Sequence, residues 1–126
     1  MGAPVQESLT LTTAGGKSAP GRVRRALTAL DGGLGEKAAD VSLLVTELVT
    51  NAVVHAGLDH ESLLEFALWA SPKRITAALE YPGESFSAKP QPETQHFGLY
   101  LVDSLSDDWG VERTDDKNRV WFEISR

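Results

Sequence analysis

Apolar residues recur along the chain with two different spacings. Alternation of apolar and polar positions predicts five strands, at residues 5–13, 62–70, 73–81, 109–113 and 118–125. Apolar positions three and four residues apart predict three helices, at residues 20–30, 36–56 and 98–105. Ser18 is a candidate cap for the first helix, with Pro20 in its first turn, and Asp31, Gly32 and Gly33 are expected to end it. Since the strands come in adjacent pairs with helices between them, we predict an α+β fold. It is a two-layer sandwich in which a mixed, mostly antiparallel sheet packs against about three helices.

The segment over residues 36–56 is rich in β-branched residues, which favour strands. Its length and its 3.6-residue period indicate a helix instead. The predicted apolar side consists of Val41, Leu44, Val45, Leu48, Ala52 and Val53. The other side carries Glu47, Asn51 and His55, each four residues after the one before.

The stripe of Glu47, Asn51 and His55 has two interpretations. It is either a solvated helix face or the lining of a site, and solvated faces usually carry several long charged side chains that this stripe lacks. A carboxylate can accept a proton from a hydroxyl group, and an Asn oxygen one turn away can bind Mg²⁺. The H-E-x-x-H spacing of zinc proteases is absent. From the stripe alone, both interpretations stay open.

Composition narrows the class of protein. The length of 126 residues suits one domain, and 41 % hydrophobic and 24 % charged residues are typical of a globular chain. There is no cysteine, which excludes disulfides, zinc fingers and thiol nucleophiles. The net charge of −6 opposes nucleic-acid binding. No apolar run is long enough to span a bilayer and no leader pattern is present, so we expect a cytoplasmic protein without membrane contact.

Residues 83–97 have no period and are predicted to form a long loop, a length that usually indicates function or mobility. Residues 1–4 are expected to be flexible. Each of two charged clusters can be interpreted either as a solvated surface or as a functional site. Arg22, Arg24 and Arg25 form either a solvated helix face or a docking surface for an acidic partner. The acidic run of Asp103, Asp107 and Asp108 is either a solvated helix end or a metal site.

Four segments carry a family resemblance. ELVTNAVVHA, at residues 47–56, resembles the N-box of the ATPases that include gyrase, heat-shock chaperones, mismatch-repair MutL and histidine kinases. PGRVRRALTAL, YPGESF and FGLYLVDSLSDDWGVERTDDKNRVWFEI resemble the first helix, the G1 box and the closing part of the small bacterial anti-sigma-factor serine kinases. The resemblance covers nearly the whole chain, in the expected order, and implies a single ATPase-like domain over residues 1–126.

The resemblance implies roles for the matching residues. Glu47 matches the catalytic base, and Asn51 matches the Mg²⁺ ligand that joins the metal to the phosphates of ATP. The nucleotide would also contact His55, Pro82, Gly83, Gly98 and Leu99. Residues 83–97 match the lid over the phosphates. A glycine at a helix N-terminus also allows an anion to approach free N–H groups closely, which independently favours phosphate binding at Gly98.

The sequence departs from the family at the G1 box. Tyr81 stands where the family has an Asp that accepts a hydrogen bond from the adenine amino group, and Ser85 replaces the second glycine. Glu80 is adjacent on the strand and should point to the opposite face, so it does not replace the Asp. Losing one such hydrogen bond costs about 1–3 kcal/mol, which is roughly a tenfold to hundredfold loss of affinity. The predicted lid contains one lysine, Lys89.

Two functions compete on this basis. In the first, the protein is a serine/threonine protein kinase that uses ATP and Mg²⁺ to phosphorylate an anti-anti-sigma factor and so regulates transcription by partner switching. In the second, it is a catalytically degenerate module that binds a sigma factor or another regulator and binds ATP weakly or not at all. The resemblance also includes a homodimer as an expected assembly. Intact Glu47 and Asn51 favour the kinase, whereas Tyr81 and the glycine-poor lid favour the binding module.

Overall fold

The computed structural model describes residues 7–55, 58–83 and 97–126. The chain order of the elements is β1 (Glu7–Ala14), α1 (Ala19–Thr28), α2 (Asp31–Leu34), a 3-10 turn (Gly35–Lys37), α3 (Ala38–His55), β2 (Leu63–Ala70), β3 (Arg74–Pro82), α4 (Phe97–Leu105), β4 (Asp108–Thr114) and β5 (Lys117–Ser125). All five predicted strands and all three predicted helices are present, with ends within a few residues of the predicted ones.

The five strands form one sheet in the order β1-β2-β3-β5-β4. Every neighbouring pair is antiparallel, so the sheet is antiparallel throughout and not mixed, mostly antiparallel, as predicted. The turn between β4 and β5 is tighter than the predicted turn over residues 115–118, because Asp115 adopts a left-handed conformation with φ of 53° and β5 already begins at Lys117. The register places Tyr81 of β3 opposite Asn118 of β5.

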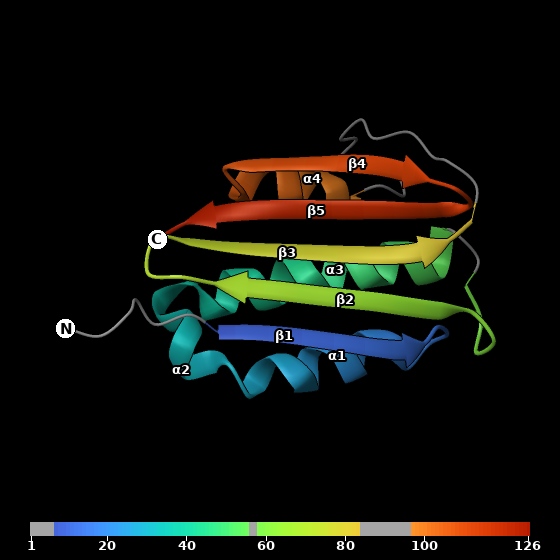
Figure 1. Ribbon diagram of the computed structural model, residues 1–126, viewed down its shortest axis with the longest axis horizontal. Coiled ribbons are helices and arrows are strands. Elements are labelled where there is room, and N and C mark those ends of the chain that lie inside the picture. The colour runs from blue at the N-terminus through green and yellow to red at the C-terminus, as the bar shows by residue number, and fades with distance from the viewer. Residues whose placement is uncertain (1–6, 56–57, 84–96) are drawn as a thin grey trace.

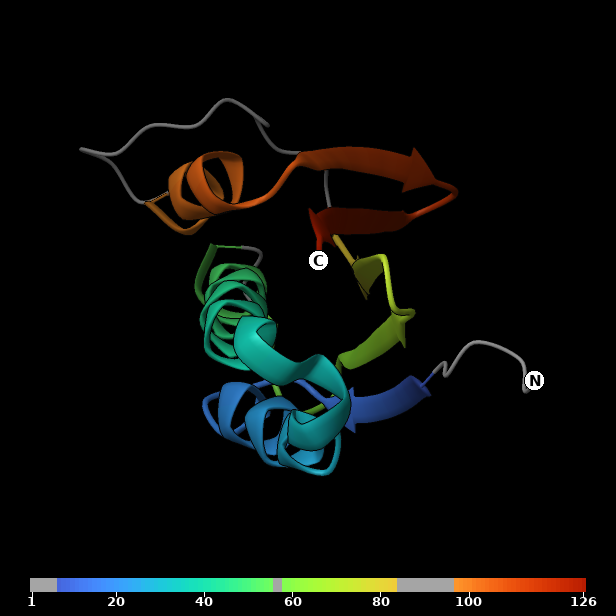
Figure 2. The same cartoon turned by 90° about the vertical axis from the view of Figure 1, so that its left-hand side faces the viewer.

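The described helices all lie on one face of the sheet, and α3 runs along the middle of this layer between α1 and α4 (Figure 2). This arrangement confirms the predicted two-layer α+β sandwich. Figure 1 shows that the C-terminal half of α3, the C-terminal end of β3 and the turn between β4 and β5 lie at the same end of the molecule. The fold therefore brings three segments that are distant in sequence to one place.

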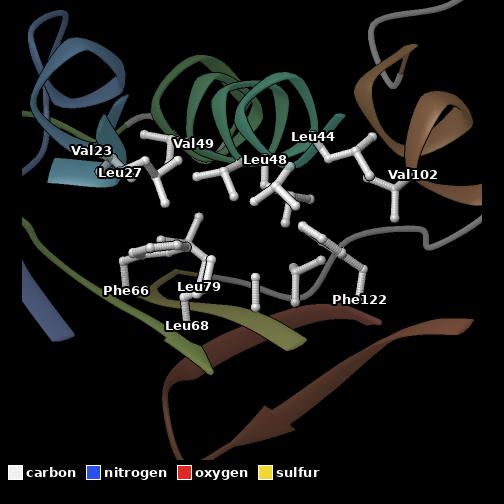
Figure 3. Packing of buried hydrophobic residues seen from close by; sticks show 14 of the residues in the cluster. Val23, Leu27, Leu44, Leu48, Val49, Phe66, Leu68, Leu79, Val102 and Phe122 are labelled. Atoms are coloured by element: carbon white, nitrogen blue, oxygen red, sulfur yellow. The ribbon is translucent and has the colours of Figure 1, made fainter. Parts of the chain in front are cut away.

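The core lies between the helix layer and the sheet (Figure 3). Leu44 and Leu48 of α3 point toward the sheet, where Phe66, Leu79 and Phe122 rise to meet them, and all five are buried. Five of the six residues predicted for the apolar side of α3 are buried, whereas Val53 is half-buried and Val49 is buried instead. Val53 lies near the end of the helix, where it lines a surface hollow with residues 14–18 and 58–60.

Two local predictions were wrong. Ser18 is the N-cap residue of α1, but its side chain makes no capping hydrogen bond because its backbone is helical rather than extended. Asp31, Gly32 and Gly33 were expected to end the first helix. That helix already ends at Thr28, and these three residues begin the one-turn helix α2. Pro20 does lie in the first turn of α1, as predicted.

Neighbouring leucines of α3 test this packing. Leu44 is 0 % exposed and Leu43 is 42 % exposed. We expect Leu44→Ala to lower the free energy of unfolding by about 2–5 kcal/mol, because it leaves a cavity between α3 and the sheet. Leu43→Ala should change it by less than about 0.5 kcal/mol. Urea denaturation followed by circular dichroism measures both, and equal losses would contradict the orientation of α3.

Candidate functional site

The candidate site lies at the end of the molecule where α3, β3 and the β4–β5 turn come together (Figure 1). On α3, Glu47 and Asn51 are half-buried and lie one turn apart, while Leu48 and Ala52 point into the core. The side chains of Glu47 and Asn51 therefore project beside the core-facing side of the helix, in its C-terminal half. His55 is the last residue of α3, and its side chain lies outside the described residues.

Asn51 has an unsatisfied polar atom. Its amide nitrogen Nδ2 is buried, and it is the one buried side-chain nitrogen or oxygen of the described residues without a hydrogen-bond partner. Leaving such a group unpaired typically costs about 1–3 kcal/mol. A buried amide that stays unpaired in the protein alone is a group that a ligand can satisfy.

Helix α4 packs beside α3 and completes the helix side of the site. Val102 of α4 is buried and approaches Leu44 of α3 (Figure 3). Gly98 and Leu99 lie in the first turn of α4, where backbone N–H groups have no partner within the helix. Their side chains, and the predicted lid over residues 84–96 with Ser85 and Lys89, lie outside the described residues.

The two residues before Pro82 on β3 point to opposite faces of the sheet, as predicted. Tyr81 is 4 % exposed and belongs to the core cluster on the helix side. Burial raises the pKa of its phenol well above the ordinary value, so the hydroxyl stays protonated at neutral pH. Glu80 lies on the uncovered face, where its carboxylate is 3.9 Å from the ammonium group of Lys117. Glu80 therefore does not replace a carboxylate at the position of Tyr81.

A polar cluster beside Tyr81 was missed by the sequence analysis. The guanidinium group of Arg113 on β4 donates hydrogen bonds to the carbonyl of Gly83 and, over 3.1 Å, to Oδ1 of Asn118. The N–H of Gly83, which has φ of 140°, donates to the carbonyl of Asp116 over 3.2 Å. The β4–β5 hairpin thus holds the turn at Pro82 and Gly83 in place. The two bonds to Gly83 join residues 30 or more positions apart, so no local sequence signal could have revealed them.

The residues present fit a metal-bound nucleotide at one end of the site. Asn51 has an amide nitrogen without a partner in the protein alone, and the oxygen of the same amide is a type of ligand that Mg²⁺ accepts together with water and phosphate oxygens. A half-turn of the Asn amide exchanges the positions of its oxygen and nitrogen, so either atom can face a ligand. Glu47 lies one turn earlier on the same helix.

The acidic run after α4 does not form a metal site. Asp103 accepts a hydrogen bond from the indole Nε1 of Trp109, and Asp107 accepts one from the backbone N–H of Ser125. The latter bond lowers the pKa of Asp107. No group of three or more acidic or histidine side chains able to hold a metal occurs among residues 7–55, 58–83 and 97–126. The carboxylates instead fasten the end of α4 to β4 and β5.

Comparisons with known proteins place the chain in a family. Residues 17–124 match the model of the histidine kinase-like ATPase domain. The chain therefore belongs to the family of histidine kinase-like ATPase domains, which confirms the resemblance seen in the sequence. A comparison with curated protein sequences gave no match.

A solved structure shows the same fold. It contains the RsbU and RsbW domains of Rv1364c from Mycobacterium tuberculosis, and it superposes with a TM-score of 0.70 at 18 % sequence identity. The match covers 95 % of the present chain and 32 % of that chain.

Within the part of the chain that the structure describes, no helix is long and apolar enough to cross a membrane.

The phenol of Tyr81 gives a prediction about alkaline pH. Folding raises the pKa of this phenol above its ordinary value of about 10. Below a pH of about 10 the phenol is neutral in both the folded and the unfolded chain, and its burial contributes fully to stability. As the pH rises further, the unfolded chain ionises first and this contribution is lost. The free energy of unfolding, measured by urea denaturation, should fall more steeply above pH of about 10 in the wild type than in Tyr81→Phe. Parallel curves would show that Tyr81 does not carry this effect.

Proposed function

We propose that the protein is an ATP-dependent serine/threonine protein kinase that phosphorylates a separate regulatory protein. The observation that carries the proposal is the buried amide nitrogen of Asn51, which has no hydrogen-bond partner and lies one turn after Glu47 on α3. Membership of the histidine kinase-like ATPase family supports nucleotide binding at this end of the fold. The proposed ligands are ATP and Mg²⁺.

Each residue of the site has a proposed task. The Asn51 amide oxygen would hold Mg²⁺, which supplies neutralisation of the phosphate charge when bound. The Glu47 carboxylate accepts the proton of the attacking serine hydroxyl as that oxygen bonds to the terminal phosphorus and the bond to the leaving oxygen breaks. Backbone N–H groups at Gly98 and Leu99 face the phosphates. Pro82 and Gly83, held by Arg113, border the base, and His55, the last residue of α3, also contacts the nucleotide.

The proposed substrate is an anti-anti-sigma factor, and the proposed outcome is control of transcription by exchange of protein partners in the cytoplasm. The structural likeness to a protein that contains RsbU and RsbW domains supports an assignment of this kind. A second copy of the chain and a sigma factor remain the other proposed partners. The net charge of −6 does not favour binding to nucleic acid.

One observation favours the second candidate function, a regulator that binds proteins without catalysis. The ring of Tyr81 belongs to the hydrophobic core at the proposed base end of the site, where the resemblance implies a smaller Asp. A module of this kind would form a partner complex whose affinity is the same with and without ATP. Strong dependence of the complex on ATP would exclude it.

The amide of Asn51 can be tested through stability as well as binding. Asn51→Leu should abolish Mg²⁺-dependent ATP binding in calorimetry while leaving the free energy of unfolding equal or higher, because it removes a buried donor that has no partner. Ser42→Ala, at the other end of α3, is the matched control and should keep both properties. Loss of stability in Asn51→Leu without loss of binding would contradict the proposed role.

The proposed catalytic role of Glu47 can be tested separately from nucleotide binding. Glu47→Gln should bind ATP with an affinity within about threefold of the wild type and lose transfer of labelled phosphate to the co-purified partner protein by about a hundredfold or more. Asp40→Asn, an acidic residue in the first turn of α3, is the control and should transfer phosphate normally. Equal transfer by Glu47→Gln and wild type would remove Glu47 from the mechanism.

A further inference from the structure

The helix-facing side of β3 and β5 is apolar up to its last pair. Ile75, Ala77 and Leu79 of β3 are buried opposite the apolar residues of β5, and then Tyr81 lies opposite Asn118, which is 1 % exposed. The buried polar side chains of the described residues are Asn118 and Thr13, and Thr13 lies on β1 at the far edge of the sheet. Tyr81 and Asn118 are therefore neighbours in register that bring polar atoms to the site end of an apolar surface.

No described residue occupies the Tyr81 hydroxyl. It makes no hydrogen bond with any described residue, and it is not among the fully buried polar atoms without a partner. Part of the small exposed surface of Tyr81 must therefore belong to its hydroxyl. A neutral phenol can donate one hydrogen bond or accept one, and its proton rotates to suit the partner.

No carboxylate takes part at this position in the described structure. Glu80 and Glu112 point to the uncovered face of the sheet, where they pair with Lys117 and Arg119 at 3.9 and 3.8 Å. The oxygen of the Asn118 amide already accepts a hydrogen bond from Arg113 over 3.1 Å. Tyr81 is thus the group on β3 that a base at this end would meet, and unlike a carboxylate it is not restricted to accepting.

Purine bases differ in what they present to such a group. Adenine carries an amino donor at position 6 and guanine carries a carbonyl acceptor there. A carboxylate accepts from the adenine amino group and repels the guanine carbonyl, since both are acceptors, whereas a hydroxyl pairs with either. We propose that the site binds ATP and GTP with nearly equal affinity and that Tyr81 is the residue that sets this relaxed choice of base. This inference rests on the proposed nucleotide-binding function.

The test compares the two nucleotides in calorimetric titrations of the full chain with MgATP and MgGTP. In the wild type the two dissociation constants should agree within about threefold. Tyr81→Phe keeps the ring and removes the hydroxyl, so both constants should rise by a similar factor of about three to ten. Tyr81→Asp should favour ATP over GTP by about tenfold or more, because an ionised carboxylate only accepts.

Glu80→Gln is the matched control, because this neighbour points to the other face of the sheet, and it should leave both constants unchanged. A wild type that prefers ATP by about tenfold or more, or a Tyr81→Phe variant with unchanged constants for both nucleotides, would overturn the inference and leave nucleotide binding standing. Failure of both nucleotides to bind the wild type would overturn the proposed function and this inference together. Tyr81→Phe decides the matter even if Tyr81→Asp does not fold.

Discussion

The packing of the apolar side of α3 against the sheet is the contact on which the candidate site depends. Leu44 and Leu48 meet Phe66 and Phe122 across the layer interface, and this contact fixes the rotation of α3 about its axis (Figure 3). A helix has one rotation for all its residues, so burying the leucines also sets where Glu47 and Asn51 project. A polar stripe at helical spacing becomes a site only because its opposite side is anchored in the core. Stability and chemistry therefore share one helix, with their residues interleaved along it.

Much of this arrangement was predictable from the sequence, because it depends on periodicity. The strands, the long helix and the burial of Leu44, Leu48 and Ala52 follow from the spacing of apolar residues. The opposite orientation of Glu80 and Tyr81 follows from the pleat of a strand. The errors lie where local rules compete. Val53 fits the helical period, but it lies near the end of the helix beside a surface hollow. The expected stop at Asp31 became the start of another helical turn.

The remaining part of the site depends on contacts between distant residues. The pairing of Arg113 with Gly83 requires β4 and β5 to fold back beside β3, and no single segment of sequence contains that information. The same is true of the amide nitrogen of Asn51, because only the folded structure shows that no acceptor lies within hydrogen-bond distance of it. The family resemblance suggested a role for Asn51, but it gave no physical measure of how ready that side chain is for a ligand. The burial of Tyr81 also emerges only in three dimensions, since a tyrosine near the end of a strand can point either way.

The order of the strands has a consequence for how the chain folds. β1 pairs with β2 along its whole length, and the first of these pairs joins Glu7 to Ala70 across α1, α2 and α3. β1 therefore has no strand partner until more than half of the chain is available, and during synthesis its hydrogen-bonding edges stay unpaired until β2 follows. Such long-range closure slows folding relative to helical proteins of the same size. Glu47 and Asn51 lie on one helix, α3, whose hydrogen bonds are local, whereas the rest of the site requires the long-range pairing of β3 with β5.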